Sequence, residues 1–347
     1  MENPFTLSFG RVPKEYILRT REYNEIIDEF QKDNSLSNLY IITGLRGSGK
    51  TVLLTSLYNY FDNNDDFVAV DLNTKSNMLE DLTAALYDKA PGKYKFLKPE
   101  FNFSFQGLTI SLKGSNPVTS LSLLLEKMLT SLKKHNKKLV ITIDDVDKGN
   151  EMIKLIKEFQ NLFRKDLPLY LIVTGLYSVV DDLEKTEGLT FLQRGQKRYL
   201  NPLNIRYIAS KYMLTFNIEE KKAKELAEVT KGYAFAYQVL GYLLFEKGNV
   251  ELDENLFRDF DYYLEEYVYN PIYIELSQKE KCILKAISLS GLHTNKELVE
   301  SGCISNQEIS RYKEKLGKKG ICDISQRGKI EIILPRFEEF IKFHEEI

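Results

Sequence analysis

The stretch "GLRGSGKT", residues 44–51, constrains the fold of this chain more than any other feature. It follows the apolar run "LYIIT" (39–43) and precedes the helical pattern "TVLLTSLYNYF" (51–61). Gly44, Gly47 and Gly49 allow the backbone to turn tightly enough to point several N–H groups at one anion. The helix that follows directs the positive end of its dipole to the same place. Strand, loop and helix together predict a phosphate-binding loop in an α/β domain.

The loop matches the pattern G-x-x-x-x-G-K-[ST] in full. In that pattern Lys50 reaches the β- and γ-phosphates of a nucleotide, and the Thr51 hydroxyl holds Mg²⁺. A glycine loop that only turns a strand into a helix is the alternative interpretation. The predicted nucleotide contacts of the loop are Gly44, Leu45, Arg46, Gly47, Ser48, Gly49, Lys50, Thr51 and Val52.

A phosphate-binding loop needs a second acid for its metal ion, and "LVITIDDVDK" (139–148) supplies one. Asp144 ends a buried apolar strand, so its carboxylate is predicted to meet Mg²⁺. Asp145 follows at the position of a water-activating acid. On its own, such an acidic pair is equally typical of a turn that ends a strand.

Three further residues are candidates for a catalytic role. Thr174 ends the next apolar strand, where its hydroxyl would sense the γ-phosphate or the attacking water, or simply cap the strand end. Arg194 and Arg198 precede the last predicted strand and are candidates for an arginine finger. Most surface arginines have no such role.

The first 200 residues alternate short apolar runs with helical patterns, which is typical of βαβ units around a parallel sheet. The other predicted strands are "FVAVDL" (67–72), "LVITID" (139–144), "LYLIVT" (169–174) and "RYLNPL" (198–203). The segment 101–112, "FNFSFQGLTISL", instead alternates apolar and polar residues and predicts a hairpin with its turn at 106–107. That hairpin is interpreted as a cover for the core or as a contact surface for a partner.

The remaining sequence predicts two further domains. Residues 203–275 are helical throughout and suggest a lid on the α/β core of residues 1–202. Residues 276–347 contain an amphipathic helix, capping boxes at Thr294–Glu297 and Ser305–Glu308, and a hairpin with Arg327-Gly328 at its tip. Three helices followed by a hairpin predict a winged helix-turn-helix.

The predicted winged helix is locally basic. Residues 305–329 carry seven basic and three acidic side chains, a net charge of +4 in a chain whose total is −2. A recognition helix would contact the major groove of double-stranded DNA and the hairpin the adjacent phosphates. A protein-docking module or a merely solvated helix face is the alternative. The candidate DNA contacts are Arg311, Lys313, Lys315, Lys318, Lys319, Arg327 and Lys329.

Composition excludes several other classes of function. No apolar stretch reaches the length of a membrane span, and the first residues show no signal-peptide pattern, so a cytoplasmic protein is expected. Cys282, Cys303 and Cys322 are too far apart for a CxxC metal site, and their odd number argues against a disulfide framework. The three histidines are scattered and offer no zinc site.

Taken together, these motifs resemble those of AAA+-type ATPases of the STAND and origin-recognition branch. The start "NPFTLSFGRVP" (3–13) is similar to a group of bacterial ATP-binding proteins of that branch, which run into a C-terminal winged helix. The resemblance implies ATP or ADP with Mg²⁺ as ligands, and slow hydrolysis from the aspartate at the second acid position. It also implies that Arg21 lies near the adenine and ribose, although Thr20 replaces the family's glycine.

In the lid, "TKGYAFAYQVLGYLL" is similar to the stretch that reads the nucleotide in STAND proteins. Gly232 matches, whereas Ala234 stands where the family has proline. The resulting hypothesis is an ATP-driven switch that controls DNA binding, or assembly on DNA, through the winged helix. The second hypothesis is a signalling or scaffold protein in which nucleotide state controls self-association or a protein partner. A small-molecule kinase is disfavoured because it would leave the winged helix without a role.

Overall fold

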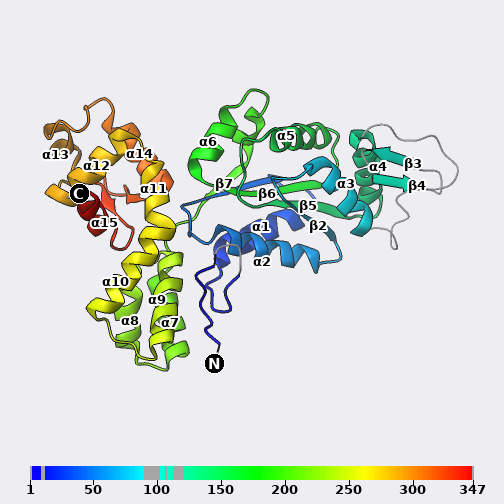
Figure 1. The fold of residues 1–347 in the computed structure, drawn as a ribbon. Coiled ribbons are helices and arrows are strands. Elements are labelled where there is room, and N and C mark those ends of the chain that lie inside the picture. The colour runs from blue at the N-terminus through cyan, green and yellow to red at the C-terminus, as the bar shows by residue number, and fades with distance from the viewer. Residues whose placement is uncertain (1, 9–11, 90–101, 106–107, 112–120, 346–347) are drawn as a thin grey trace. The chain divides into compact units, whose positions relative to one another are not determined.

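The computed structural model describes residues 2–8, 12–89, 102–105, 108–111 and 121–345 (Figure 1). The chain divides into two compact units, and each combines separate stretches of sequence. The sheet unit contains residues 20–43 and 51–198, and the helical unit contains residues 1–19, 44–50 and 199–347.

The sheet unit is a five-stranded sheet in the order β2-β5-β6-β1-β7, with parallel pairing of β2 with β5, β5 with β6 and β6 with β1. The predicted strands are thus found, but the last begins earlier, at Gln196, and ends at Tyr199, because the chain beyond it runs to Pro202, which cannot donate to a sheet. The bounds are α1 Thr20–Gln31, β1 Leu39–Thr43, α2 Lys50–Asp62, β2 Phe67–Leu72, α3 Met78–Lys89, β3 Asn102–Phe105, β4 Leu108–Ser111, α4 Leu121–Lys134, β5 Lys138–Ile143, α5 Asn150–Phe163, β6 Leu169–Gly175, α6 Tyr177–Lys185, η1 Thr190–Arg194 and β7 Gln196–Tyr199.

Successive residues of each central strand are buried on opposite faces of this sheet. In β1, Leu39 and Ile41 join a core cluster with residues of α3, α4, α5 and α6. Tyr40 points to the other face, where its ring lies 5.6 Å from that of Phe30 in α1. Figure 1 shows α1 and α2 on that second face. A sheet covered by helices on both sides is what the continuous apolar runs of the strands predict.

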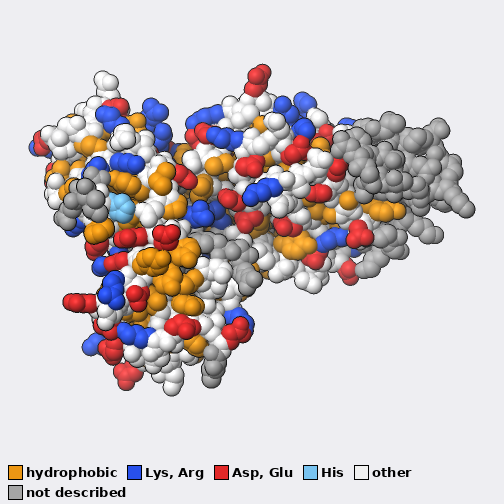
Figure 2. Space-filling model, in the orientation of Figure 1, with side chains coloured by type: hydrophobic (Ala, Val, Ile, Leu, Met, Phe, Trp, Pro, Cys, Tyr) orange, Lys and Arg blue, Asp and Glu red, His pale blue; other side chains and the backbone are white. Residues whose placement is uncertain are grey.

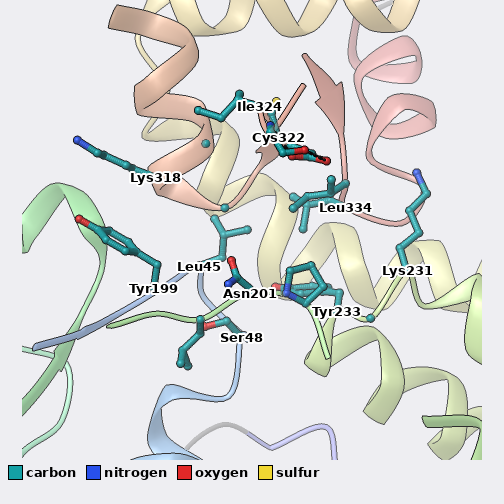
Figure 3. A pocket seen from close by; sticks show the side chains of 18 of the residues that line it. Leu45, Ser48, Tyr199, Asn201, Lys231, Tyr233, Lys318, Cys322, Ile324 and Leu334 are labelled. Atoms are coloured by element: carbon teal, nitrogen blue, oxygen red, sulfur yellow. Dashed lines mark hydrogen bonds between the residues drawn. The ribbon is translucent and has the colours of Figure 1, made fainter. Parts of the chain in front are cut away.

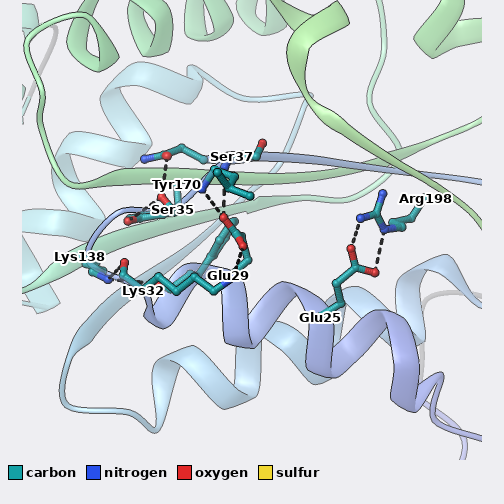
Figure 4. Close-up of polar contacts among 11 residues, drawn as sticks. Glu25, Glu29, Lys32, Ser35, Ser37, Lys138, Tyr170 and Arg198 are labelled. Carbon is teal, nitrogen blue, oxygen red and sulfur yellow. Dashed lines mark hydrogen bonds and ion pairs between the residues drawn. The ribbon is translucent and has the colours of Figure 1, made fainter.

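The turn between α1 and β1 is fixed by polar contacts, which Figure 4 shows. The Glu29 carboxylate, 7% exposed, accepts the backbone N–H groups of Leu36 and Ser37. Lys138 Nζ donates to the last carbonyls of α1, at 2.9 Å from that of Phe30. These contacts satisfy the end of the helix and hold the start of β1 in place.

The predicted hairpin is also present. Strands β3 and β4 pair antiparallel with Phe105 opposite Leu108, as the predicted turn at 106–107 requires. The turn residues 106–107 lie outside the described residues, and the side chains of both strands are not described either.

The helical unit contains two groups of helices with one continuous apolar core. Phe5 packs into that core from the N-terminal segment, with its ring 5.6 Å from the ring of Tyr237. The bounds are α7 Ile205–Phe216, α8 Glu220–Val229, α9 Ala234–Lys247, α10 Glu254–Leu264, the π-helical turn Glu265–Tyr269, α11 Asn270–Ile274, α12 Gln278–Ser290, α13 Asn295–Glu300, α14 Ile309–Lys319, β8 Cys322–Asp323, β9 Glu331–Ile332 and α15 Phe337–Glu345.

The helices and hairpin predicted after residue 276 are found, with two differences. Thr294 and Glu297 form the expected capping box at the start of α13. Helix α14 begins only at Ile309, because the Ser305 hydroxyl bonds to the Glu308 carboxylate rather than to the helix backbone. The hairpin strands are two residues each, shorter than their apolar pattern suggested.

Cys282 in α12 and Cys303 after α13 form a disulfide, with Cα atoms 5.7 Å apart. The prediction against a disulfide is therefore wrong for this pair. Their separation of 21 residues gave no signal, because the approach of the two cysteines depends on how α12 and α13 pack. Cys322 is free and buried.

Candidate functional site

The glycine loop adopts the conformation that its sequence predicts. Gly47 and Gly49 have φ angles of 74° and 90°, a region that residues with a side chain rarely adopt. Lys50 begins α2 directly after them. The loop thus has the tight backbone and the helix start required for binding phosphate.

Two polar side chains of the loop are enclosed by the protein. Lys50 is 9% exposed, and its Nζ donates to the carbonyls of Gly44 and Leu45 at 3.0 and 2.9 Å. Ser48 is 6% exposed, and its hydroxyl has no hydrogen-bond partner within the described part of the chain. A buried cation and an unsatisfied hydroxyl on a glycine loop fit a phosphorylated ligand, which would offer oxygens to both.

Residues at the start of α9 contact this loop directly. The Tyr233 hydroxyl donates to the Arg46 carbonyl, and the Phe235 N–H donates to the Gly47 carbonyl at 3.0 Å. Burial raises the pKa of Tyr233 well above its ordinary value, so this hydroxyl stays a hydrogen-bond donor. Sequence reasoning missed both contacts, since only the packing of the helical unit brings α9 to the loop.

A cavity of about 580 Å³ adjoins the loop within the helical unit. Figure 3 shows Leu45 and Ser48 on one side of it, with Lys318 and Ile324 from the segment around α14 and β8 on another. The Arg19 guanidinium, which also lines the cavity, donates to the Ser48 carbonyl at 2.9 Å. The cavity therefore places the loop, the segment before α9 and the last helices of the chain around one space.

The predicted metal-binding pair is assembled in the sheet unit. The Thr51 hydroxyl donates to Asp144 Oδ2 at 2.7 Å. The Thr174 hydroxyl donates to the other oxygen of Asp144 and accepts the Asp145 N–H at 3.0 Å. Thr174 is fully buried. Hydroxyl and carboxylate oxygens are ligands that Mg²⁺ prefers, so Thr51 and Asp144 fit a metal-bound nucleotide.

Asp145 and a carboxylate that sequence reasoning missed lie beside this pair. Asp145 is exposed and has a φ angle of 52°, a conformation that aspartate tolerates better than most residues. Asp71, on the neighbouring strand β2, accepts the Thr142 hydroxyl at 2.6 Å. Burial raises the pKa of Asp71, and the charge of Asp144 adds to that rise. The only signal for Asp71 was an acid near the end of an apolar strand.

The candidate arginines are placed differently from one another. Arg21 is exposed in the first turn of α1. Arg198 lies in an ion pair with Glu25, which Figure 4 shows. Arg194 is exposed beside Gly195, which packs on Leu39 at the start of β1. Asp144 follows the opposite, carboxyl end of β5, so the structure does not bring Arg194 and Asp144 together within the sheet unit.

The basic residues of the last helices divide into two sets. Lys313 is only 8% exposed, and burial lowers its pKa. Lys318 and Lys319 form ion pairs with Glu314 and Glu280. The other four are exposed or partly exposed: Arg311, Lys315, Arg327 and Lys329. Of these, Arg311 and Lys315 lie over the ring of Tyr312.

Two comparisons bear on the class of protein that this fold and site define. Residues 26–180 match the family described as an AAA domain, and this segment includes the glycine loop, Asp144 and Thr174. The Walker-type ATPase of Pyrococcus abyssi shares the fold with a TM-score of 0.64 and 16% identity, covering 95% of this chain and 96% of its own. The matched segment places an AAA domain at residues 26–180, and the likeness to the Pyrococcus structure shows a shared fold.

A second solved structure shows a similar likeness of fold. The ORC2 protein of Aeropyrum pernix, solved as ADPNP and ADP complexes, has a TM-score of 0.58 and 14% identity, covering 97% of this chain and 96% of its own. At these identities the likeness concerns the fold. No curated protein has a matching sequence. Among the described helices, none is both long and apolar enough to cross a membrane.

Proposed function

We propose that this chain is an ATP- and Mg²⁺-binding switch ATPase with slow hydrolysis, which works in the cytoplasm. The observation that carries the proposal is the enclosed Lys50 on a glycine loop, followed by Thr51 bonded to Asp144. Bound ATP would supply a γ-phosphate for hydrolysis to ADP and phosphate. We propose that residues 1–202 form the ATPase core, 203–275 the lid and 276–347 a winged helix-turn-helix.

Each residue of the core has a proposed role in this account. Lys50 would exchange its two carbonyl partners for phosphate oxygens, and Thr51 and Asp144 would hold Mg²⁺. Asp145 would orient water, and Thr174 keeps the Asp144 carboxylate in place through its hydroxyl. Arg21 would lie near the base, while Arg194 would act as an arginine finger only toward another molecule.

The lid would transmit the nucleotide state. Tyr233 and Phe235 donate hydrogen bonds to the loop carbonyls of Arg46 and Gly47. A change in the loop backbone would therefore change the position of the start of α9. Gly232, just before α9, and Lys318 of α14 line the cavity beside the loop. Movement of the lid would therefore alter the exposure of the last helices, and we propose that this controls binding to double-stranded DNA or assembly on it.

A prediction separates the roles of the two aspartates. Asp144→Asn keeps the size of the side chain but replaces one of its two acceptor oxygens by an NH2 donor and removes the charge that Mg²⁺ needs. We expect the Mg²⁺-dependent gain in ATP affinity, measured by titration with a fluorescent ATP analogue, to fall at least about tenfold. Asp145→Asn should retain that affinity and lose hydrolysis. Equal Mg²⁺ dependence in wild type and Asp144→Asn would contradict the metal role of Asp144.

A second prediction concerns DNA. Arg311→Glu/Lys315→Glu should weaken binding to a random-sequence duplex and lower the slope of its salt dependence by about 2, because each phosphate contact adds about 0.9. Lys313→Met is the matched control from the same helix, and it should leave binding unchanged because Lys313 is only 8% exposed. Binding that is insensitive to salt, or equal in the variants and wild type, would contradict the DNA role.

One observation favours a function other than DNA binding. Of the seven basic residues predicted to face DNA, Lys313 is buried and Lys318 and Lys319 are in ion pairs, so less positive charge is available than the sequence suggests. The second candidate function is therefore a nucleotide-controlled signalling or scaffold protein whose last helices dock a protein partner. Nucleotide-dependent association without any response to DNA would favour it.

A further inference from the structure

A second cavity lies in the sheet unit, at the edge where β1 begins. Its volume is about 430 Å³, and it lies between the start of β1, the end of α5 and η1. This is the edge opposite to Asp144 and Thr174, which follow or end their strands at the carboxyl side. The cavity is therefore separate, within its unit, from the proposed metal-binding pair.

The walls of this second cavity, which we call the basic pocket, are aromatic and positively charged. The rings of Phe163 and Phe191 each stack against Phe159, with centroids 6.3 and 6.1 Å away. Arg164 and Arg194 supply two positive charges, and no acidic residue stands among the described lining residues. Aromatic residues and arginine are the types enriched in the centres of protein interfaces.

These groups are not satisfied within the described part of the chain. The guanidinium groups of Arg164 and Arg194 are exposed and have no ion pair or hydrogen bond there, in contrast to Arg198 with Glu25. Leu36, beside the pocket, is 90% exposed, and Phe163 is 44% exposed. Exposed apolar groups beside uncommitted charges indicate a surface that binds something carrying apolar groups and carboxylates.

The helical unit has a groove, here called the acidic groove, that carries both apolar groups and carboxylates. This groove of about 570 Å³ between α10 and α15 is lined by Glu254, Asp261 and Glu265. Tyr262 and Phe343, which also line it, are 60% and 59% exposed. Figure 2 shows hydrophobic and acidic side chains beside one another over the helices that Figure 1 labels α9 and α10.

The charges of this acidic groove are only partly balanced. Arg336 is held by Asp261, with its Nη2 at 2.6 Å from Oδ2. Arg258 is the other cation among the described lining residues, beside Glu254 and Glu265. Burial, and next the charge of Asp261, raise the pKa of Glu265 against smaller opposite effects of His344 and Arg336. An arginine from outside the chain would stabilise the charged form of this carboxylate further.

We propose that the basic pocket of one molecule binds the acidic groove of a second copy of this chain. Tyr262 and Phe343 would pack against Phe163 and Leu36, and Arg164 and Arg194 would pair with Glu254 and Glu265. In this contact Arg194 would bind carboxylates and would not act as an arginine finger. The contact is head-to-tail, because two basic pockets facing each other would bring arginine against arginine. The inference requires neither nucleotide nor DNA.

A charge exchange tests this contact by sedimentation velocity over a concentration series, without nucleotide. Wild type should self-associate. Arg164→Glu/Arg194→Glu and Glu254→Lys/Glu265→Lys should each weaken self-association at least about tenfold, because truncating or reversing central interface residues has such effects. A mixture of the two variants should associate again, since one reversed pocket then meets one reversed groove.

Lys296→Glu reverses a charge on a side chain that is 83% exposed in α13 and should have no effect. Tyr262→Ser/Phe343→Ser provides a second test of the groove without any charge change. Monomeric wild type at every concentration overturns the proposal, as does self-association that persists in both reversed variants. Self-association that is lost in Arg164→Glu/Arg194→Glu but kept in Glu254→Lys/Glu265→Lys also overturns the proposal. It would show that the basic pocket binds something other than the acidic groove of a second copy.

Discussion

Lys50→Ala should lower the affinity of the protein for ATP with Mg²⁺ by roughly tenfold to hundredfold, because hydrogen bonds to charged groups contribute about 1.5–3 kcal/mol. Lys50 is the only lysine or arginine of the loop that is nearly enclosed, at 9% exposure, whereas Arg46 is exposed. The measurement is isothermal titration with ATP in the presence of Mg²⁺.

Lys296→Ala is the control for the loss of a lysine, because its side chain is 83% exposed and lies in α13. Thermal unfolding of both variants shows whether either change affects folding. The enclosed position of Lys50 makes this control necessary, since its Nζ also holds the Gly44 and Leu45 carbonyls. Unchanged ATP affinity in a folded Lys50→Ala protein would contradict the role of the loop.

Gly232→Ala should destabilise the helical unit by about 2–5 kcal/mol, from the strain of a positive φ and from overpacking. The φ angle of Gly232 is 77°, and a Cβ there would lie 2.4 Å from the Leu203 carbonyl oxygen. That oxygen belongs to backbone held next to Gly232, because the Leu203 N–H donates to the Gly232 carbonyl at 2.7 Å. Neither group can move away without breaking this contact.

Gly248→Ala is a matched control for the backbone strain alone. Its φ angle is 68°, and a Cβ there would meet nothing within 4 Å. We expect Gly248→Ala to cost about 1–2 kcal/mol, from the left-handed conformation only. Urea unfolding followed by the fluorescence of the 21 tyrosines, in a chain without tryptophan, measures both. Equal costs for the two variants would refute the close approach of Leu203.

Much of the sheet unit could be predicted from sequence because its signals are local. The run "LYIIT" became β1 with the predicted bounds, and the alternation around residues 106–107 fixed the register of β3 and β4. The pairing of Thr51 with Asp144 also followed from local motifs. Thr51 lies in the first turn of the helix after β1, Asp144 follows β5, and both strands end at the same edge of the parallel sheet, with β6 between them.

What sequence could not predict depends on packing between distant segments. The contacts of Tyr233 and Phe235 with the loop join residues nearly 190 positions apart, with no periodic pattern to mark them. The burial of Lys313 was hidden because a lysine in a basic helix gives the same sequence signal whether it is exposed or enclosed. The Cys282–Cys303 bond likewise depends on the packing of α12 and α13.

The measurement that tests the central claim most directly is fluorescence anisotropy of a labelled random-sequence duplex, titrated with the protein at two salt concentrations. Each titration is run with ATP and Mg²⁺ and with ADP, for wild type and for Lys50→Ala. A nucleotide-gated switch predicts salt-dependent affinity that differs between ATP and ADP in wild type and not in Lys50→Ala. Affinity that is the same with ATP and ADP in wild type, or that is absent in both, would contradict control of DNA binding by the nucleotide.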